Sequence, residues 1–158
     1  MSFTSTKVET PEAVSDLWRT PPELYSLLNQ EFHFSDFDPA SPNPDGLRDY
    51  DSLGTEWKGE SIFLNPPYSN VEPWLRQSVS ESRKGKTLVV LLRVDTSTDW
   101  YHDLVAPFAE VRFLRGRVSF VLGKDYTDKK GKLHRKGERT RANFASMLAI
   151  FRPKTESV

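Results

Sequence analysis

The stretch GESIFLNPPYSNVEPWL, from Gly59 to Leu75, decides the fold. Its SIFLN segment at 61–65 predicts a buried strand, and the two prolines that follow cannot continue that strand, because each lacks an N–H and fixes its own φ. The residues after the prolines predict a helix, with Pro73 near its start and Gly85 just beyond its end. A strand, a rigid turn and a helix therefore follow one another.

Strand and helix patterns alternate on both sides of this stretch. Residues 21–32 place leucines on one helical face, with Thr20 as a candidate N-cap and Glu23 three residues later as in a capping box. The remaining predicted elements are a short strand at 32–37, a buried strand at 86–94 of the type found in parallel sheets, a short helix at 98–108 broken at Pro107, and strands at 109–116, 117–123 and 143–151. This alternation predicts an α/β sheet with functional groups at the carboxyl ends of its strands.

Composition limits the class of protein. At 158 residues and 37% hydrophobic content, the chain is long enough for one domain, which we place at 16–158 after a polar lead-in at 1–15. We expect a cytoplasmic protein, because no apolar run reaches membrane-spanning length and the N-terminus lacks a signal-peptide pattern. The absence of cysteine excludes disulfides, a zinc ribbon and a thiol nucleophile, and we identify no metal-binding residues.

The net charge of zero conceals an uneven distribution. The segment 124–141 contains eight Lys or Arg residues and three acidic residues, which gives it a charge of +5, so the remainder of the chain carries −5. Two interpretations fit such a segment. It is either a solvated hairpin or an arm that contacts phosphates, whose affinity would depend steeply on salt.

The turn Asn65-Pro66-Pro67-Tyr68 carries the clearest chemical signal. The side-chain carbonyl of Asn65 and the main-chain carbonyl of Pro66 form a pair of acceptors on a stiff turn, which suits a planar amino group with two hydrogens. Accepting both hydrogens, for example those of adenine N6, favours a pyramidal nitrogen whose lone pair can attack. Tyr68 adds an aromatic face for a base, which must leave the duplex to reach it. A plain turn that ends the strand is the structural alternative.

The chain resembles the small phage DNA N6-adenine methyltransferase (Dam-like) family from about Trp18 to Phe151. Asn-Pro-Pro-Tyr matches the signature of amino-group methyltransferases that use S-adenosylmethionine. Five further blocks resemble that family in order, namely WRTPPEL from Trp18, FDPAS from Phe37, LLRVDTSTDWYH from Leu91, RFLRGRVSF from Arg112 and NFASMLAIF from Asn143. The resemblance implies a compact Rossmann-like methyltransferase sheet with flanking helices and a basic hairpin insertion at 124–141.

The resemblance also implies roles for individual residues. Catalysis would fall to Asn65, Pro66, Pro67 and Tyr68. The methionine part of S-adenosylmethionine would lie at Thr20 and Pro21, where a helix N-terminus suits its carboxylate. Its cationic amino group would lie at the strand end Asp38-Pro39-Ala40, where a carboxylate can hold it. Double-stranded DNA would be held by five basic residues, namely Lys129, Lys130, Lys132, Arg135 and Arg139. We expect a monomer by default.

One departure and two alternatives remain open. No Gly-x-Gly follows Asp38, so the adenosine pocket is unassigned, and Asp49 or Asp51 are candidates for the ribose hydroxyls. The turn also serves glutamine methyltransferases that act on proteins, since an amide presents the same two hydrogens. A DNA-binding relative without catalytic activity is the second alternative. Trp57, Trp74 and Trp100 are expected to be packing residues.

Overall fold

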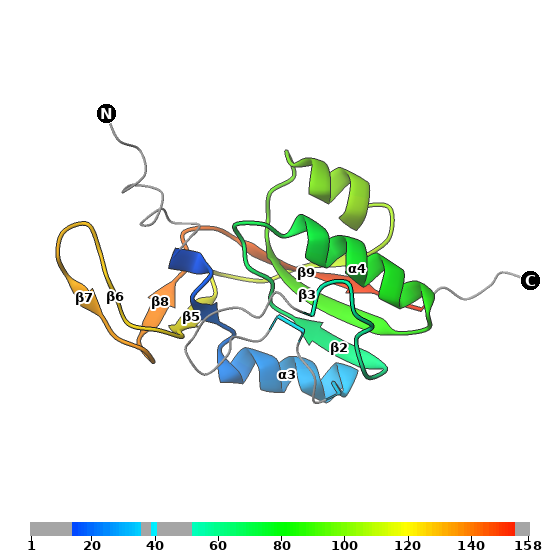
Figure 1. Ribbon diagram of the computed structural model, residues 1–158, viewed down its shortest axis with the longest axis horizontal. Helices are drawn as coiled ribbons and strands as arrows, with labels where there is room; N and C mark the ends of the chain where they lie inside the picture. Colours follow the sequence, from blue (N-terminus) through cyan, green and yellow to red (C-terminus); the bar gives the residue numbers. More distant parts are fainter. Residues whose placement is uncertain (1–13, 36–38, 41–51, 154–158) are drawn as a thin grey trace, which may run out of the picture.

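The computed structural model describes residues 14–35, 39–40 and 52–153 (Figure 1). Its largest element is a four-stranded sheet, in which the strands lie in the order β2 (Ser61–Leu64), β3 (Thr87–Arg93), β9 (Ser146–Phe151) and β4 (Glu110–Phe113). Strands β2 and β3 are parallel, and β9 is antiparallel to both β3 and β4. Strands β2, β3 and β4 therefore run in one direction, and β9 is inserted between the last two in the opposite direction.

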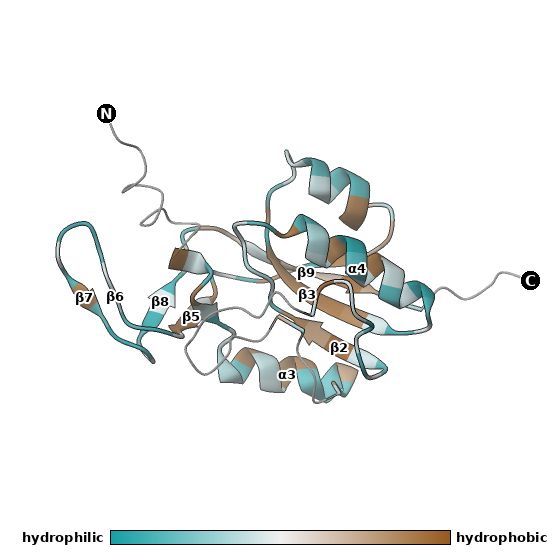
Figure 2. Cartoon of the chain, in the orientation of Figure 1, coloured by the Kyte–Doolittle hydropathy of each residue, from teal (hydrophilic) through white to brown (hydrophobic). Residues whose placement is uncertain are grey.

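Burial explains why β3 and β9 are central. The five residues in the middle of β3 are buried, as is every residue of β9, so both faces of these strands are covered. Figure 2 shows the same strands as the hydrophobic part of the molecule. The strands predicted at 86–94 and 143–151 are confirmed; β3 pairs in parallel with β2, as its buried pattern predicts, but it also pairs with β9 in the antiparallel direction. The fold is mixed α/β and mostly sheet.

Two helices flank the sheet. Helix α4 (Glu72–Arg83) connects β2 to β3 and contacts β3 and β9. Helix α3 (Pro22–Phe32) packs on β2 through the edge-to-face contact of Tyr25 with Phe63, whose ring centroids are 5.5 Å apart. Figure 1 shows the two helices on opposite sides of the sheet. Each helix in the described residues is too short or too polar to span a lipid bilayer.

The ends of the helices differ from the sequence predictions. Thr20 is not the N-cap of α3; Pro21 occupies that position without a side-chain cap, and Pro22 begins the helix. His33, at a φ of 51°, ends α3, so Phe32 belongs to the helix rather than to the predicted strand at 32–37, whose residues 36–38 lie outside the described part. The short helix before Pro107 is the π-helical turn η1 (Tyr101–Val105).

A second, smaller sheet joins the beginning of the chain to the basic segment. Strands β1 (Trp18–Arg19), β5 (Ser119–Leu122) and β8 (Arg139–Arg141) are antiparallel, with β5 in the middle. Between β5 and β8 the chain forms a hairpin of β6 (Tyr126–Thr127) and β7 (Leu133–His134). Figure 1 shows this hairpin extending away from the main sheet.

A buried carboxylate holds the loop that precedes β2. Glu81 of α4 accepts a hydrogen bond from the backbone N–H of Trp57 (2.6 Å) and pairs with Lys86 (3.3 Å). The ring of Trp57 is fully buried and stacks on that of Trp74, with centroids 6.2 Å apart. Burial raises the pKa of Glu81, but the hydrogen bonds from Trp57, Lys84 and Lys86 outweigh it, so the pKa lies below its ordinary value.

Replacing this carboxylate should destabilise the fold. We expect Glu81→Ala to lower the free energy of unfolding by about 3 kcal/mol, because the buried N–H of Trp57 loses its acceptor and the mostly buried Lys86 ammonium loses its nearest carboxylate. Urea unfolding measures the loss, with Glu72→Ala as the control. Glu72 lies on the same helix but is exposed, so removing it should cost less than about 1 kcal/mol.

The Glu81 contribution should also depend on pH. Its folded-state pKa is lowered, so the stabilisation is fully present above the pKa of the unfolded carboxyl and is lost as the pH falls through the folded value. Equal losses for Glu81→Ala and Glu72→Ala at neutral pH would contradict this account of the loop.

Candidate active site

The turn Asn65–Tyr68 lies at the carboxyl end of β2. All four of its residues are buried, with Asn65 at 3% and Tyr68 at 6% exposure. After the two prolines the chain reverses, and the N–H of Asn70 donates to the carbonyl of Pro67 (3.2 Å). The predicted strand end is thus confirmed as a compact turn that the surrounding protein encloses.

The side chain of Tyr68 fixes this turn to two sheets. Its hydroxyl donates to the carbonyl of Leu91 in β3 (3.2 Å). Its ring makes edge-to-face contacts with Phe120 of β5 (6.1 Å between centroids) and with Phe144, which precedes β9 (5.7 Å). The position of the turn therefore depends on both sheets.

Further aromatic rings complete a cluster that the sequence did not identify. Trp18 stacks on Phe120 (5.0 Å, 25° between planes) and on Phe144 (6.0 Å, 25°). Trp18 and Phe144 are partly exposed, whereas Tyr68 and Phe120 are buried. We call Trp18, Tyr68, Phe120 and Phe144 the aromatic cluster. Trp18 was missed because it precedes the first strong helical pattern, and Phe144 because it reads as the start of a core strand.

Several loops meet at the same edge of the main sheet as the turn. The loop after β3 is fixed there by the N–H of Val94, which donates to the carbonyl of Ala145 (2.8 Å). The loop after β4 is fixed by the N–H of Leu114, which donates to Ser146 (3.0 Å). Because β2, β3 and β4 are parallel, their carboxyl ends share one edge, where α/β proteins place their sites.

The predicted cofactor residues lie in two places. Thr20 and Pro21 follow β1 directly, and Trp18 of that strand belongs to the aromatic cluster, so this turn is brought close to Tyr68. Pro39 and Ala40 are buried, and the carbonyl of Pro39 accepts from the hydroxyl of Ser52 (2.5 Å). Asp38, Asp49 and Asp51 lie outside the described residues.

An acidic side chain near the N-terminus also reaches the turn. The carboxylate of Asp16 accepts from the backbone N–H of Ser69 (3.2 Å) and from its hydroxyl (2.5 Å). Ser69 directly follows Tyr68, so Asp16 ties the beginning of the described chain to the end of the turn. Sequence reasoning missed this contact, because the two residues are 53 positions apart.

The tip of the basic hairpin is ordered by its own side chains. The carboxylate of Asp128 accepts from the backbone N–H groups of Lys130 and Lys132 (both 2.9 Å) and bonds to the ring of His134 (2.8 Å). The hydrogen bond from His134 holds the pKa of Asp128 below its ordinary value. The predicted DNA-contacting residues of this hairpin are exposed, namely Lys129, Lys130, Lys132 and Arg135.

Arg139 differs from the other predicted DNA contacts. Its guanidinium forms two hydrogen bonds with the carboxylate of Glu23 in α3 (2.6 and 3.0 Å). This pairing lowers the pKa of Glu23 and raises that of Arg139. Arg139 therefore connects the small sheet to the beginning of α3, next to Thr20 and Pro21.

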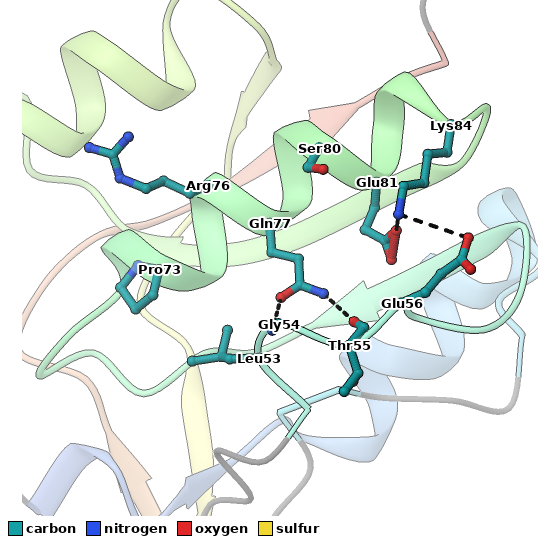
Figure 3. A pocket seen from close by; sticks show the side chains of 10 residues that line it. All are labelled: Leu53, Gly54, Thr55, Glu56, Pro73, Arg76, Gln77, Ser80, Glu81 and Lys84. Carbon is teal, nitrogen blue, oxygen red and sulfur yellow. Dashed lines mark hydrogen bonds and ion pairs between the residues drawn. The ribbon is translucent and has the colours of Figure 1, made fainter.

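A shallow pocket of about 420 Å³ lies apart from these residues, between the 53–56 loop and α4 (Figure 3). The side-chain amide of Gln77 crosses it, accepting from the N–H of Gly54 (2.8 Å) and donating to the carbonyl of Thr55 (2.6 Å). None of residues 65–68 lines this pocket. Its contacts fix the loop that precedes β2, so we treat the pocket as structural.

Removing the hydroxyl of Tyr68 should loosen the turn without emptying the core. We expect Tyr68→Phe to lower the free energy of unfolding by about 1 kcal/mol, because the ring contacts stay while the hydrogen bond to Leu91 is lost. Denaturant unfolding measures the effect. Tyr101→Phe is the control, because Tyr101 is only partly buried and its hydroxyl makes no hydrogen bond within the described residues. Equal stability of Tyr68→Phe and the wild-type chain would contradict the anchoring role.

Comparisons with known proteins identify the family. The family model described as DNA N-6-adenine-methyltransferase (Dam) matches residues 7–158. A protein of Haemophilus phage HP1 (strain HP1c1), named DNA N-6-adenine-methyltransferase, is 30% identical over 159 aligned residues, which cover 94% of this chain and 86% of the relative. A protein of Escherichia phage T1 with the same name is 26% identical over 137 aligned residues, which cover 73% of this chain and 58% of the relative.

No solved structure matched the chain. The family match covers nearly the whole sequence, including the Asn65–Tyr68 turn and the basic hairpin. The chain belongs to the Dam family of DNA N-6-adenine-methyltransferases.

Proposed function

We propose that this chain transfers a methyl group from S-adenosylmethionine to N6 of an adenine in DNA. The observation that carries the proposal is the placement of Asn65-Pro66-Pro67-Tyr68 at the carboxyl end of a parallel strand, in the chain of a Dam family member. The finer assignments below follow from that placement.

The chemistry rests on two acceptor oxygens. The side-chain carbonyl of Asn65 and the main-chain carbonyl of Pro66 accept the two hydrogens of the adenine amino group. Accepting both hydrogens withdraws the nitrogen lone pair from the ring and directs it at the incoming methyl carbon. As the N–C bond forms, the bond between the methyl carbon and the donor's sulfonium sulfur would break and leave a neutral thioether. The amino nitrogen would become cationic, and the two oxygens would stabilise that charge until one proton leaves to solvent.

Burial strengthens these interactions. Asn65 is 3% exposed, so water competes little for its carbonyl, and a fixed acceptor in a water-poor site acts more strongly than the same group in solution. Tyr68 holds the turn through Leu91, so the oxygens need not reorganise when charge develops.

The described surroundings fit a sulfonium cofactor. The aromatic cluster places electron-rich ring faces next to the turn, and such faces attract cations. We propose that Thr20, Pro21, Asp38, Pro39 and Ala40 hold S-adenosylmethionine. When bound, it supplies the electrophilic methyl group. The N-terminus of α3 is a weaker anion site than the sequence suggested, because Pro22 has no N–H and the carboxylate of Glu23 already lies there.

The target base needs an aromatic surface as well as acceptors. The ring of Tyr68 is almost fully covered by its neighbours, so the partly exposed rings of Trp18 and Phe144 offer the base the larger accessible area. We propose that the adenine rotates out of a double helix and lies beside this cluster.

The proposal extends to the setting of the enzyme. We propose that the four-stranded sheet is part of a Rossmann-like methyltransferase sheet, since β2, α4 and β3 form a parallel strand–helix–strand unit. We also propose one domain at 16–158 with the basic insertion at 124–141, acting as a monomer on double-stranded DNA in the cytoplasm of a bacterial host. A role in restriction–modification belongs to the same proposal.

Two alternatives use the same turn. A glutamine methyltransferase would modify protein, and a catalytically silent relative would bind DNA without the cofactor. The Dam family match and the +5 segment at 124–141 favour DNA methylation over the glutamine alternative, and binding of S-adenosylmethionine distinguishes the silent relative.

Substitution of Asn65 tests the chemistry. We expect Asn65→Ala to reduce methyl transfer by roughly 10²–10³-fold, the cost of removing one preorganised polar group, while the fold is kept. Asn65→Asp, which has the same shape and accepts hydrogen bonds, should retain more activity than Asn65→Ala. The measurement is transfer of labelled methyl from S-adenosylmethionine to unmethylated DNA, with N6-methyladenine identified by mass spectrometry.

Three results would contradict the assignment. Label in protein rather than DNA would support the glutamine alternative. Equal labelling of DNA by Asn65→Ala would remove Asn65 from the chemistry. DNA binding without measurable binding of S-adenosylmethionine in calorimetry would support the silent relative.

The hairpin lysines should act through charge. We expect the triple substitution of Lys129, Lys130 and Lys132 by Ala to weaken DNA binding for all sequences alike. The salt dependence should also become shallower, with the slope of log K against log salt changing by up to about 2.7. Fluorescence anisotropy across a salt series measures this slope. A loss confined to one DNA sequence, with the slope unchanged, would instead indicate base contacts.

A further inference from the structure

The small sheet has two chemically different faces. Side chains alternate along a strand, and paired residues of adjacent strands point to the same side. Phe120 pairs with Thr140, and Trp18 pairs with Leu122, so one face carries the aromatic cluster. On the other face Ser119 pairs with Arg141, and Val121 lies between Arg19 and Arg139.

Arg117 extends this second face. The carbonyl of Val118 accepts from the N–H of Ala142 (2.9 Å), so the pairing of the two strands continues one residue beyond Ser119 and Arg141. Val118 is buried with Phe120 on the aromatic side, and alternation then places Arg117 on the side of Arg141. The arginine face, as we call it, thus carries Arg19, Arg117, Arg139 and Arg141.

Three of these four arginines form no ion pair with a carboxylate of the described residues, and of the three Arg19 is only partly exposed. Arg139 is neutralised by Glu23, whereas Arg117 and Arg141 are exposed and form no ion pair with a described carboxylate. Figure 2 shows β8 as hydrophilic, in contrast to the buried strands of the main sheet. Arg117 lies two residues before Ser119, the partner of Arg141, so the two arginines are diagonal neighbours on this face, and a bound anion would offset their like charges.

The position of this pair relative to the turn indicates its role. Arg117 follows β4 in the loop that ends at the same edge of the main sheet as Asn65. Arg141 lies three residues before Phe144, whose ring contacts Tyr68. The hairpin lysines belong to a tip that extends away from the main sheet, whereas Arg117 and Arg141 lie on the back of the layer that packs on the turn.

We propose that Arg117 and Arg141 form a phosphate-binding pair that holds the DNA backbone against the arginine face of the small sheet, whose other face packs on the Asn65–Tyr68 turn. A guanidinium matches the geometry of a phosphate with two parallel hydrogen bonds, so a pair of arginines fixes the position of a strand more precisely than lysines do. This inference rests on the proposed function and adds to it a second contact with DNA, separate from the basic hairpin.

The double substitution Arg117→Gln with Arg141→Gln tests the proposal. Binding of an unmethylated duplex by the full chain is measured by fluorescence anisotropy between about 50 and 200 mM salt. The loss of two phosphate contacts should change the slope of log K against log salt by about 1.8 and raise the Kd at the lower salt concentration. The double substitution to Lys, which keeps the charges, should leave the slope near that of the wild-type chain while methyl transfer at saturating DNA falls.

Arg83→Gln is the matched control. Arg83 is an exposed arginine at the end of α4, just before β3 begins, so it lies at the edge of the main sheet opposite to Asn65. Its removal should leave the slope unchanged. If the Arg117 and Arg141 double variant to Gln matches Arg83→Gln while the wild-type chain binds and methylates DNA, the phosphate pair is refuted and the proposed function stands. If the wild-type chain neither binds nor methylates DNA, the proposed function itself is refuted, and the phosphate pair with it.

Discussion

The contacts of Tyr68 are the constraint on which the rest of the site depends. One side chain carries a hydrogen bond to the carbonyl of Leu91 in the main sheet and edge-to-face contacts with Phe120 and Phe144. Aromatic pairs of this kind contribute about 0.5–1.5 kcal/mol each beyond their buried area, so the ring is a strong junction for its size. Because Tyr68 ends the rigid turn, the same contacts that join the sheets also set the direction of the Asn65 amide.

The contacts of Tyr68 bring the proposed sites for catalysis, cofactor binding and DNA binding together in a chain of 158 residues. Strand β1 supplies Trp18 to the aromatic cluster and leads directly into the Thr20–Pro21 turn. Strand β5 supplies Phe120 on one face and, through its pairing with β8, carries arginines on the other. A displacement of the small sheet would therefore disturb the proposed catalytic turn, the proposed cofactor turn and the proposed DNA contacts together. The parts of the proposed site are therefore joined through one small sheet and do not lie on independent loops.

The main elements could be predicted from sequence because their patterns are dense. The strands at 61–64 and 87–93 are apolar runs bounded by clear breakers, and the helix at 22–32 shows a regular apolar face. The antiparallel insertion of β9 was not predictable, since a strand buried on both faces has the same composition in either direction. Thr20 is not the N-cap of α3, because Pro21 occupies that position. Glu23 therefore does not form a capping box and pairs instead with Arg139, which is 116 residues away.

The Asn65–Tyr68 turn could be recognised from the sequence, whereas the residues around it could not, because the turn is contiguous and its surroundings are not. Asn65–Tyr68 is contiguous, so its chemistry can be read from four adjacent residues. The aromatic cluster, the Asp16 contact with Ser69 and the arginine face each join segments that only the folded chain brings together. Aromatic, acidic and basic residues of these types are common in any sequence, so only their contacts in the folded chain distinguish them.

In the proposed complex with DNA, the two groups of basic residues have different roles. Lysines on the extended hairpin are compact, strongly hydrated charges, suited to attracting DNA from a distance and to contacts that tolerate any sequence. Arginines on the back of the aromatic layer are planar donors, suited to fixing a phosphate and so the position of the DNA relative to that layer. The Glu23 carboxylate pairs with Arg139 and uses it to hold α3, so Arg117 and Arg141 are the exposed arginines on that face that remain without a carboxylate of the described residues.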